Sequence, residues 1–543
     1  MHAGVVGRSA EGVWTACLRA AGSRRGAAAL FLIALATYWI EAIAWPLQRG
    51  RDSWDYWLYW LQLGDSHPPF SWVMLFRTPL TPLVTGLPMS LGGARLLEVV
   101  MSAIYGASVV GWAWAARPFG RKAALIVAVA VLVLQIPYAA LFHEVSSDFL
   151  FGAILAGWSG VVVRAVLRPS SRLFAAAGMG AALLTLTRPA GQVLVAAAAV
   201  VALVAPGSFR RRVAGLAVVL LAALVPLAGW AALNDARYGD FTVARGGKAW
   251  VPFYKVHTQV DPANGPASKR LADAIARDVI TLPPYRRLHV GTQTYLRVGA
   301  NLEVIRMIAL SDRVFGRSSR YSVLYDAAVE AIRRRPGAYV DDIATTMWSF
   351  TTQRFALAPV TRKRSFPREP ATMLVNGKPF PSPTSVSPVL SLVSYGFVWC
   401  PTDDFERCVV RDPSRAFASP RDQRRYVALV SRIRDWNAQL PLRNGNVWLA
   451  QKLGTVSWNT PPSFVWIVLA LAGIVAWRPR GWPALIVLLV GAGLVLFVHA
   501  LSQAPQSEYE LPLAPLFAFV AIAAFAGARS PRRRRALGRD HEL

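Results

Sequence analysis

The chain alternates between long apolar runs and short polar segments in its first and last parts. Each run approaches the ~20 residues that a helix needs to cross a bilayer. The pattern predicts an all-α polytopic membrane protein with about ten transmembrane helices. The ten runs lie at 27–46, 92–115, 123–141, 149–166, 173–187, 190–206, 212–233, 462–478, 481–500 and 510–528.

Short basic loops between these runs set the expected orientation. All of them fall on one side of the membrane if the N-terminus is cytoplasmic, which is the side where Lys and Arg remain. We therefore expect a multi-pass protein of the inner or plasma membrane with both termini in the cytoplasm. The basic segments are Arg117–Lys122, Arg164–Arg172, Arg210–Arg212, Arg478–Arg480 and the tail that contains Arg529–Arg535.

The distinctive polar clusters all fall on the opposite, external side, and the spans carry few charges. We predict a bundle at 1–233 with a catalytic first external loop at 47–91. An external domain at 234–461, the last three spans at 462–528 and a basic tail at 529–543 follow. A transporter would more often place its polar groups near the middle of the bilayer.

The region 234–461 is too long to be a connector and is expected to be mixed but mainly helical. A turn-rich, strand-like stretch at 237–255 opens it, and the Pro- and Ser-rich middle at 359–420 lacks periodicity. One amphipathic stretch is expected to lie on the membrane surface. The expected helices are 265–280, 295–314, 321–334, the interfacial stretch 338–357, and 420–440.

Composition supports a membrane protein: 54% of the 543 residues are hydrophobic and 16% are charged. The formal net charge is +29, and the short basic loops account for much of it, so nucleic acid is not an expected partner. The external region is also basic, which suits anionic lipid or phosphate, although a solvated basic surface explains it equally well. Cys400 and Cys408 are close enough in sequence for a disulfide on an oxidising side, and a free pair remains the alternative.

The first external loop contains two acids, Asp52 and Asp55, among aromatic residues, and ends in Arg77-Thr78-Pro79. Carboxylates and aromatics at the mouth of a bundle suggest chemistry at the membrane surface. An interfacial amphipathic helix with solvated acids is the plain alternative.

Four stretches together resemble the polyprenyl-phosphate-dependent glycosyltransferases of the GT-C superfamily. The similarity is greatest to the bacterial branch related to protein O-mannosyltransferases and the lipid A aminoarabinose transferase. It covers roughly residues 27–350 and the last spans, whereas 359–460 matches nothing we recognise. The stretches are Asp52-Ser53 with Tyr56 and Arg77-Thr78-Pro79, Ser147-Asp148-Phe149-Leu150-Phe151, Leu186-Thr187-Arg188-Pro189, and Arg334-Arg335-Pro336-Gly337-Ala338-Tyr339.

The resemblance implies an integral membrane enzyme whose donor is a polyprenyl-phosphate sugar, reached from the lipid. The acceptor would be an envelope glycan, lipid or protein, and the sugar would be transferred with inversion. Asp52 occupies the position of the family's first-loop acid and is our choice for the general base, with Asp55 second. Arg188 and Arg77 would contact the donor phosphate through paired hydrogen bonds.

Other residues receive supporting roles from the same resemblance. Asp148, a further catalytic candidate, and Glu144 could orient the acceptor or ligate a metal, although acids at a helix N-terminus are also favoured by the helix dipole. Snorkelling toward headgroups is the alternative for Arg188. Tyr56, His143 and Tyr509 are further candidates for positioning the donor or acceptor.

The chain also departs from the family pattern. Glu508-Tyr509-Glu510 stands where Arg-Tyr is usual before the last span, and Thr81 replaces a Tyr of the first loop. His143 and Glu144 are too few ligands for a metal, so no metal is expected. No phosphate-binding glycine loop is present, so we expect no cofactor and no nucleotide sugar as the direct donor.

Two functions from other classes remain open. A transporter or flippase of lipid-linked sugars would carry polar groups inside its spans and would not need Asp52. A non-catalytic scaffold would bind envelope polymers through the basic region, with Asp52 and Arg188 far from any cavity.

Overall fold

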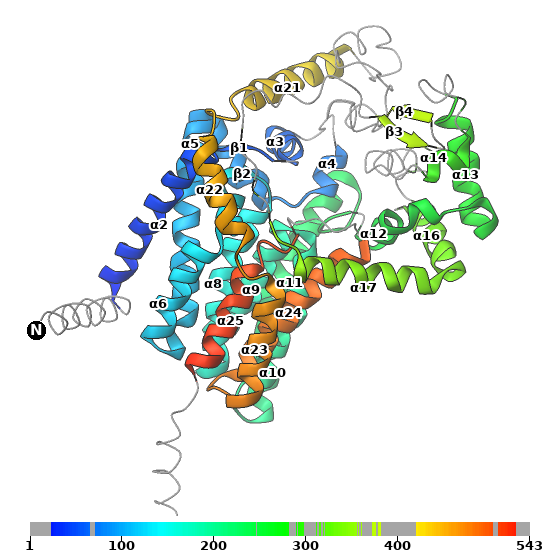
Figure 1. The fold of residues 1–543 in the computed structure, drawn as a ribbon. Coiled ribbons are helices and arrows are strands. Elements are labelled where there is room, and N and C mark those ends of the chain that lie inside the picture. The colour runs from blue at the N-terminus through cyan, green and yellow to red at the C-terminus, as the bar shows by residue number, and fades with distance from the viewer. Residues whose placement is uncertain are drawn as a thin grey trace, which may run out of the picture.

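A computed structural model describes residues 23–50, 52–65, 71–245, 247–281, 289, 291–297, 311, 314–315, 319, 321–355, 357, 360, 372–375, 378–381, 420–502 and 509–527. These residues are mostly helical. Long helices form a bundle, and a helical region stands at one end of it (Figure 1). We call this the domain end of the bundle.

The described residues contain six helices that are long and apolar enough to span a membrane. A seventh span is formed if the pair Arg121–Leu134 and Ile136–His143, bent by 68°, crosses as one. The prediction of a polytopic membrane protein is therefore confirmed, with fewer full-length spans than ten. The six are α2 (Arg24–Ala44), α5 (Leu80–Ala116), α8 (Asp148–Leu167), α11 (Phe209–Tyr238), α22 with α23 (Val447–Trp477) and α24 (Trp482–Ser502).

The other three apolar runs form helices that are shorter than a span normally needs. They are α9 (Ser171–Thr187), η4 with α10 (Pro189–Val204) and α25 (Ala514–Ala526). The Arg188-Pro189 step separates the first two because a residue before proline disfavours the α conformation, and Arg188 is extended. In the run predicted at 510–528, residues 510–513 form turns, so the helix begins only at Ala514.

Helix α5 begins inside the predicted first loop and is broken in the middle. The predicted loop 47–91 therefore contains α3 (Ser53–Gln62), α4 (Ser71–Phe76) and the first part of α5. The helix leaves helical geometry at Gly92 and Gly93, and Gly93 has φ +64°. The part before the break is therefore a separate helical segment at the domain end.

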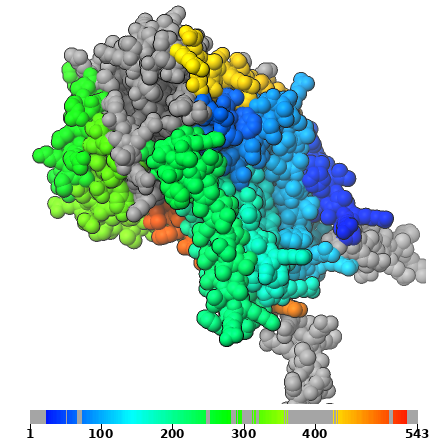
Figure 2. Space-filling view, turned by 180° about the vertical axis from the view of Figure 1, so that it is seen from behind, coloured from blue at the N-terminus to red at the C-terminus, as the bar shows by residue number. Residues whose placement is uncertain are grey.

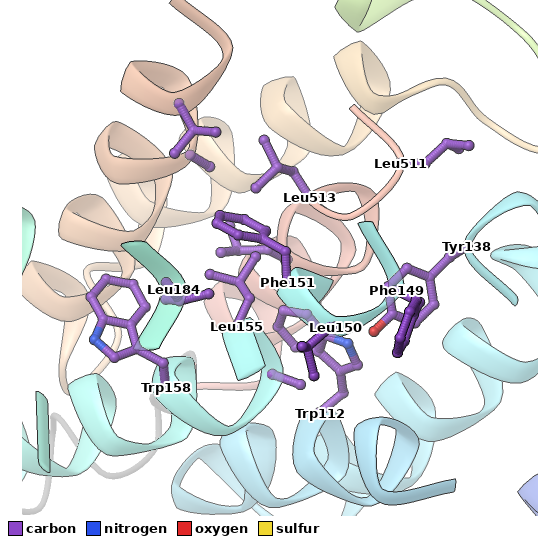
Figure 3. Packing of buried hydrophobic residues seen from close by; sticks show 14 of the residues in the cluster. Trp112, Tyr138, Phe149, Leu150, Phe151, Leu155, Trp158, Leu184, Leu511 and Leu513 are labelled. Atoms are coloured by element: carbon purple, nitrogen blue, oxygen red, sulfur yellow. The ribbon is translucent and has the colours of Figure 1, made fainter. Parts of the chain in front are cut away.

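Aromatic and small residues pack the centre of the bundle (Figure 3). Phe149 and Phe151, at the start of α8, are buried among helices that include Trp112 of α5 and Leu184 of α9. A Cβ at Gly152 would lie 2.7 Å from the ring of Tyr138, so this glycine permits the close approach. The start of α8, which begins with Asp148, is fixed by this packing.

Several basic loops lie together at the end opposite the domain end. Gly527 lies against Pro479 and Phe119, and Gly481 lies against Leu167. The loops after α5, α8 and α23 therefore meet at one end, next to the end of α25. Which side of a membrane this end faces stays a prediction.

At the domain end, separate polar segments are joined by backbone hydrogen bonds. Strand β1 (Gln48–Arg49) pairs in parallel with β2 (Glu144–Val145). The N–H of Arg245 donates to the carbonyl oxygen of Leu75 at 2.5 Å. The first loop is thereby held against the turn before α8 and the segment after α11.

The region after α11 has a small hydrophobic core of its own. The predictions of helices at 265–280, 321–334, 338–357 and 420–440 are confirmed, the third as α17; that this helix lies on a membrane surface stays a prediction. The predicted stretch 295–314 falls mostly outside the described residues, as do Cys400 and Cys408. The elements are α12 (Gly247–Val256), α13 (Pro266–Asp278), α14 (Thr292–Arg297), α16 (Ser322–Arg334), α17 (Pro336–Thr352), β3 (Thr372–Val375), β4 (Lys378–Pro381) and α21 (Pro420–Ala438).

The strand-like interpretation of 237–255 is wrong. Helix α11 continues to Tyr238, and α12 occupies the second half of the stretch. Phe253 and Val256 are fully buried in the small core, and their spacing of three residues suits one face of a helix. Packing of this face decides the structure in place of the local preference for strand.

Helix α11 lies at the surface on the back of the bundle. Figure 2 shows α11 within the green column on this face. Leu221 and Val225 are each 64% exposed, which suits contact with lipid. This face borders the cavity described below.

Candidate active site

Helix α3 presents the two acids of the first loop to one arginine. Asp52 stands at the position before the helix but does not cap it through its side chain. Arg77 donates from Nη1 to Asp52 at 3.0 Å, and from Nε and Nη2 to Asp55 at 3.0 and 2.7 Å. Both carboxylates therefore share one guanidinium, and Asp52 serves no capping function.

The two acids differ in their surroundings. The side chain of Asp52 is 38% exposed and that of Asp55 is 19% exposed. Burial raises the pKa of Asp55, while the charge of Arg77 acts in the opposite direction. Asp55 is thus a half-buried, ion-paired group and not the solvated acid of the plain alternative.

Tyr56 connects this pair of acids to the start of α8. It is buried, and the guanidinium carbon of Arg77 lies 5.6 Å from its ring centroid. Its hydroxyl is hydrogen-bonded to Ser147, and burial raises its pKa to about 12, so the phenol stays neutral. The hydrogen bond to Ser147 places Tyr56 next to the residue that precedes Asp148, and the charge of Arg188 also acts on Tyr56.

Asp148 and Arg188 form a second, more buried ion pair. Their side chains are 7% and 12% exposed, respectively. Asp148 is the first residue of α8, and Arg188 ends α9 in an extended conformation imposed by Pro189. The pairing shows that Asp148 is more than an acid placed near a helix dipole.

Tyr509 completes the surroundings of Arg188. The guanidinium carbon lies 5.1 Å from the centroid of the Tyr509 ring. That ring stacks on His499 of α24 at 4.1 Å. Three distant segments of the chain, at 148, 188 and 509, therefore meet at this one guanidinium.

A cavity of about 1070 Å³ lies beside the turn that contains Arg188. Thr185 and Gln192 line it and flank this turn in sequence. Its walls are mainly apolar, from Leu224 to Ala231 of α11 and from the segment after that helix. Its polar lining includes Asp240, Arg245, Ser319, Ser322 and Tyr325.

His143 and Glu144 are adjacent in sequence but lie in different surroundings. His143 is fully buried, stacks on Tyr38 at 4.2 Å and has its Nε2 3.7 Å from Glu41 Oε2. Glu144 lies in β2 and pairs with Gln48. Within the described residues, no three His, Cys, Asp or Glu side chains gather as metal ligands would.

Two ion pairs, one buried and one with a half-exposed acid, were not predicted from the sequence. Arg245 contacts Asp240 at 3.0 Å beside the cavity. Lys255 contacts Asp342 at 3.1 Å and donates to Thr346 at 2.8 Å, which ties α12 to α17. The spacing of Asp342 and Thr346 on an amphipathic helix was the one available signal.

No protein-family model matches this chain, and no curated protein matches it. Among solved structures, the chain is similar to "ArnT from Cupriavidus metallidurans bound to Undecaprenyl phosphate". The identity is 13%, the match covers 95% of this chain and 80% of that one, and the TM-score is 0.31.

Proposed function

We propose that this protein is an integral membrane glycosyltransferase that uses a polyprenyl-phosphate sugar as donor. The observation that carries the proposal is that Tyr56 links two carboxylate–guanidinium clusters: its ring lies near Arg77, and its hydroxyl bonds to Ser147, which precedes Asp148. One cluster supplies a partly exposed acid, Asp52, and the other supplies Arg188, whose side chain is 12% exposed. Transfer of a sugar from a phosphate requires a base for the acceptor hydroxyl and a cation for the leaving phosphate.

The reaction needs little covalent chemistry from the protein. The acceptor hydroxyl attacks the anomeric carbon, its oxygen forms the new glycosidic bond, and its proton passes to the Asp52 carboxylate. The bond from the anomeric carbon to the phosphate oxygen breaks, and polyprenyl phosphate leaves with the electron pair. One displacement of this kind inverts the anomeric centre.

The two arginines have different tasks in this scheme. Arg188 uses Nη1 for Asp148, which leaves other N–H donors of its planar group for a phosphate. Arg77 donates hydrogen bonds to both Asp52 and Asp55, so a phosphate could bind it only by replacing one of these carboxylates. We therefore assign Arg188 as the main phosphate ligand and Arg77 mainly to hold the acids.

The apolar cavity suits the polyprenyl chain. Leu224 to Ala231 extends about 10 Å along α11, at 1.5 Å per residue. The same helix presents exposed Leu221 and Val225, so an isoprenoid chain could enter from the lipid along this face. The sugar-phosphate end would then lie near Thr185 and Gln192, beside the Arg188 turn.

The proposal includes an orientation. The domain end faces the outside of an inner or plasma membrane because the short basic loops belong in the cytoplasm. The acceptor is then an envelope glycan, lipid or protein. A basic region beside the site favours anionic membrane lipid as a neighbour.

A flippase of the same donor is the second candidate, because acidic groups are buried inside the spans. Glu41 of α2 and Glu98 of α5 are both buried, with His143 and Arg443 as neighbours. Such groups often mark transport pathways. A flippase would move the donor across the bilayer without releasing polyprenyl phosphate.

The test uses purified protein in proteoliposomes with a panel of polyprenyl-phosphate sugars and acceptor fractions from cell envelopes. Release of polyprenyl phosphate, together with a glycosylated product, supports the transferase. Donor movement without release supports the flippase. Neither release nor movement with any donor contradicts both functions.

A further inference from the structure

The break in α5 is held by a residue that lies far away in the sequence. At the break, the N–H of Ala94 donates to Oε1 of Gln439 at 3.0 Å. A Cβ on Gly93 would lie 2.6 Å from that same oxygen. An N–H released by a broken helix needs a partner, and Gln439 supplies it from beyond α21.

One helical turn beyond the break, a second contact fixes the rest of α5. Arg443 donates from Nη1 and Nη2 to the buried Glu98 at 3.1 and 3.0 Å. Its Nη2 also donates to the carbonyl oxygen of Ala42 at 3.2 Å. A single guanidinium therefore joins the end of α2 to α5.

The backbone around Arg443 follows the end of α2. The N–H of Leu442 donates to Leu47 at 3.2 Å, and the N–H of Asn446 donates to Ile43 at 2.7 Å. At Gly445, a Cβ would lie 2.1 Å from the carbonyl oxygen of Ala44, so only glycine fits there. We call residues 436–446 the strap.

The start of the strap also touches the helix of the acids. Trp436 meets Trp57 of α3 edge to face, with the centroids 5.8 Å apart. Earlier in α21, Arg425 pairs with Asp65 just after α3. Helix α21 crosses the domain end close to α3 (Figure 1).

Helix α3 in turn is bound to the segment of α5 before the break. Trp60 Nε1 donates to Ser90 Oγ at 2.8 Å. Gly86 allows the close approach, because a Cβ there would lie 2.1 Å from the Trp60 ring. Residues 80–91 and α3 thus form one unit, which joins the bundle part of α5 at Gly92 and Gly93.

We propose that the strap sets the angle of this unit and thereby places Asp52 and Asp55 against the Arg188 site. Gln439 and Arg443 are positioning residues, since they contact the break and the bundle and do not reach the acids themselves. The expected effect of the strap on turnover rests on the proposed function, whereas its expected effect on the angle of the unit does not. It gives the segment after residue 420 a role in the reaction.

The experiment measures geometry and turnover separately. Spin labels at Gly64→Cys, after α3, and at Gly229→Cys, on α11, report the position of the acid unit in full-length protein without its native cysteines. Neither glycine has another atom within 4 Å of an added Cβ. Gln439→Ala should shift or broaden the label distance and lower kcat about tenfold, the size of one lost hydrogen bond.

Several variants separate positioning from a structural defect. Gln439→Glu retains an acceptor for the Ala94 N–H and should restore both the distance and kcat. Arg443→Lys should act like Gln439→Ala, because a point charge does not replace the paired contact with Glu98. The KM for the donor should change little in all of them, since the cavity along α11 does not include the strap. Gln451→Ala, at an exposed position of α22, is the matched control.

An unchanged label distance in Gln439→Ala and Arg443→Lys would overturn the inference. A shifted distance with unchanged kcat would overturn it too, because the strap would then hold α3 without affecting the reaction. If the wild-type protein transfers no sugar, the proposed function fails, and the label distances still test the strap.

Discussion

The guanidinium of Arg188 lies over the ring of Tyr509, with its central carbon 5.1 Å from the ring centroid. The Tyr509 ring also stacks on the ring of His499, and this second contact fixes its position. A cation over an aromatic face is stabilised by about 0.5–2 kcal/mol. Tyr509 therefore holds Arg188 in place while Asp148 pairs with it.

This contact predicts a difference between two substitutions of Tyr509. Tyr509→Leu removes the aromatic face and should weaken binding of polyprenyl phosphate by roughly 2- to 30-fold. Tyr509→Phe retains the face and should bind nearly as the wild type does. Equilibrium binding of labelled polyprenyl phosphate to protein in detergent measures both. Equal losses in the two variants would show that the hydroxyl matters and the ring contact does not.

A second prediction concerns the fork of Arg188. Arg188→Lys keeps the charge for Asp148 but cannot offer planar paired donors to a phosphate at the same time. The kcat/KM for the donor should fall about 10²-fold, the size of one lost electrostatic contact in a transition state. Turnover assays give the ratio, and thermal unfolding shows whether the fold survives. Wild-type turnover in Arg188→Lys would mean that Arg188 serves only the ion pair.

A third prediction follows from the surroundings of Asp55. Burial raises the pKa of this carboxyl, and the charge of Arg77 lowers it. Arg77→Gln removes the lowering influence, so the pKa of Asp55 should rise further. The carboxyl of Asp55, followed by carbon-13 NMR of aspartate-labelled protein and assigned with Asp55→Asn, should then titrate at higher pH than in the wild type. Arg334→Gln, at an exposed arginine, is the control. A shift of the Asp55 titration to lower pH in Arg77→Gln would show that Arg77 does not lower the pKa of Asp55.

A fourth prediction concerns the stability of the helical region near α13. Glu330 accepts hydrogen bonds from the N–H groups of Ala267 and Ser268 at 3.0 and 2.8 Å. Burial alone would raise the pKa of Glu330, but these bonds and the Ser268 hydroxyl lower it. Because folding lowers the pKa of Glu330, the ionised carboxylate stabilises the fold at pH values above its ordinary pKa of roughly 4.3. This stabilisation is lost as the pH falls below roughly 4.3 and through the pKa of the folded state.

Hydrogen exchange in peptides that cover Pro266–Asp278 measures this effect. In the wild type, protection should fall as the pH is lowered through roughly 4.3 to below the folded pKa. Glu330→Gln should show less protection at neutral pH and a flatter dependence on acid. Equal pH dependence in both proteins would mean that the bonds to Glu330 do not stabilise α13.

Local periodicity explains why part of the fold could be predicted from the sequence. Helices α13 and α16 were found because their apolar residues recur at helical spacing over a polar background. The apolar runs were found because a bilayer requires length and hydropathy alone. Helix α12 was missed because its turn-rich start suggested strand, whereas the buried positions of Phe253 and Val256 depend on a partner helix.

The candidate site could likewise be predicted only in part from the sequence. The sequence singled out Asp52, Asp148 and Arg188, and the structure brings their segments together through Tyr56; their roles stay predictions. His143 was grouped with them because it adjoins Glu144, but the turn after α7 (Ile136–Ala140) directs it toward Glu41. The contact of Gln439 with Ala94 joins residues that are 345 positions apart, and no local pattern marks it.

The most direct measurement of the central claim is the turnover of Asp52→Asn, compared with wild type and with Asp326→Asn in α16. Purified proteins would be given the active polyprenyl-phosphate sugar and acceptor, and released polyprenyl phosphate would be counted. We predict a loss of at least ~10²-fold in Asp52→Asn, because the amide cannot accept the hydroxyl proton. Asp326→Asn should keep wild-type turnover. Full activity in a folded Asp52→Asn protein would contradict the assignment of the first loop as the catalytic base.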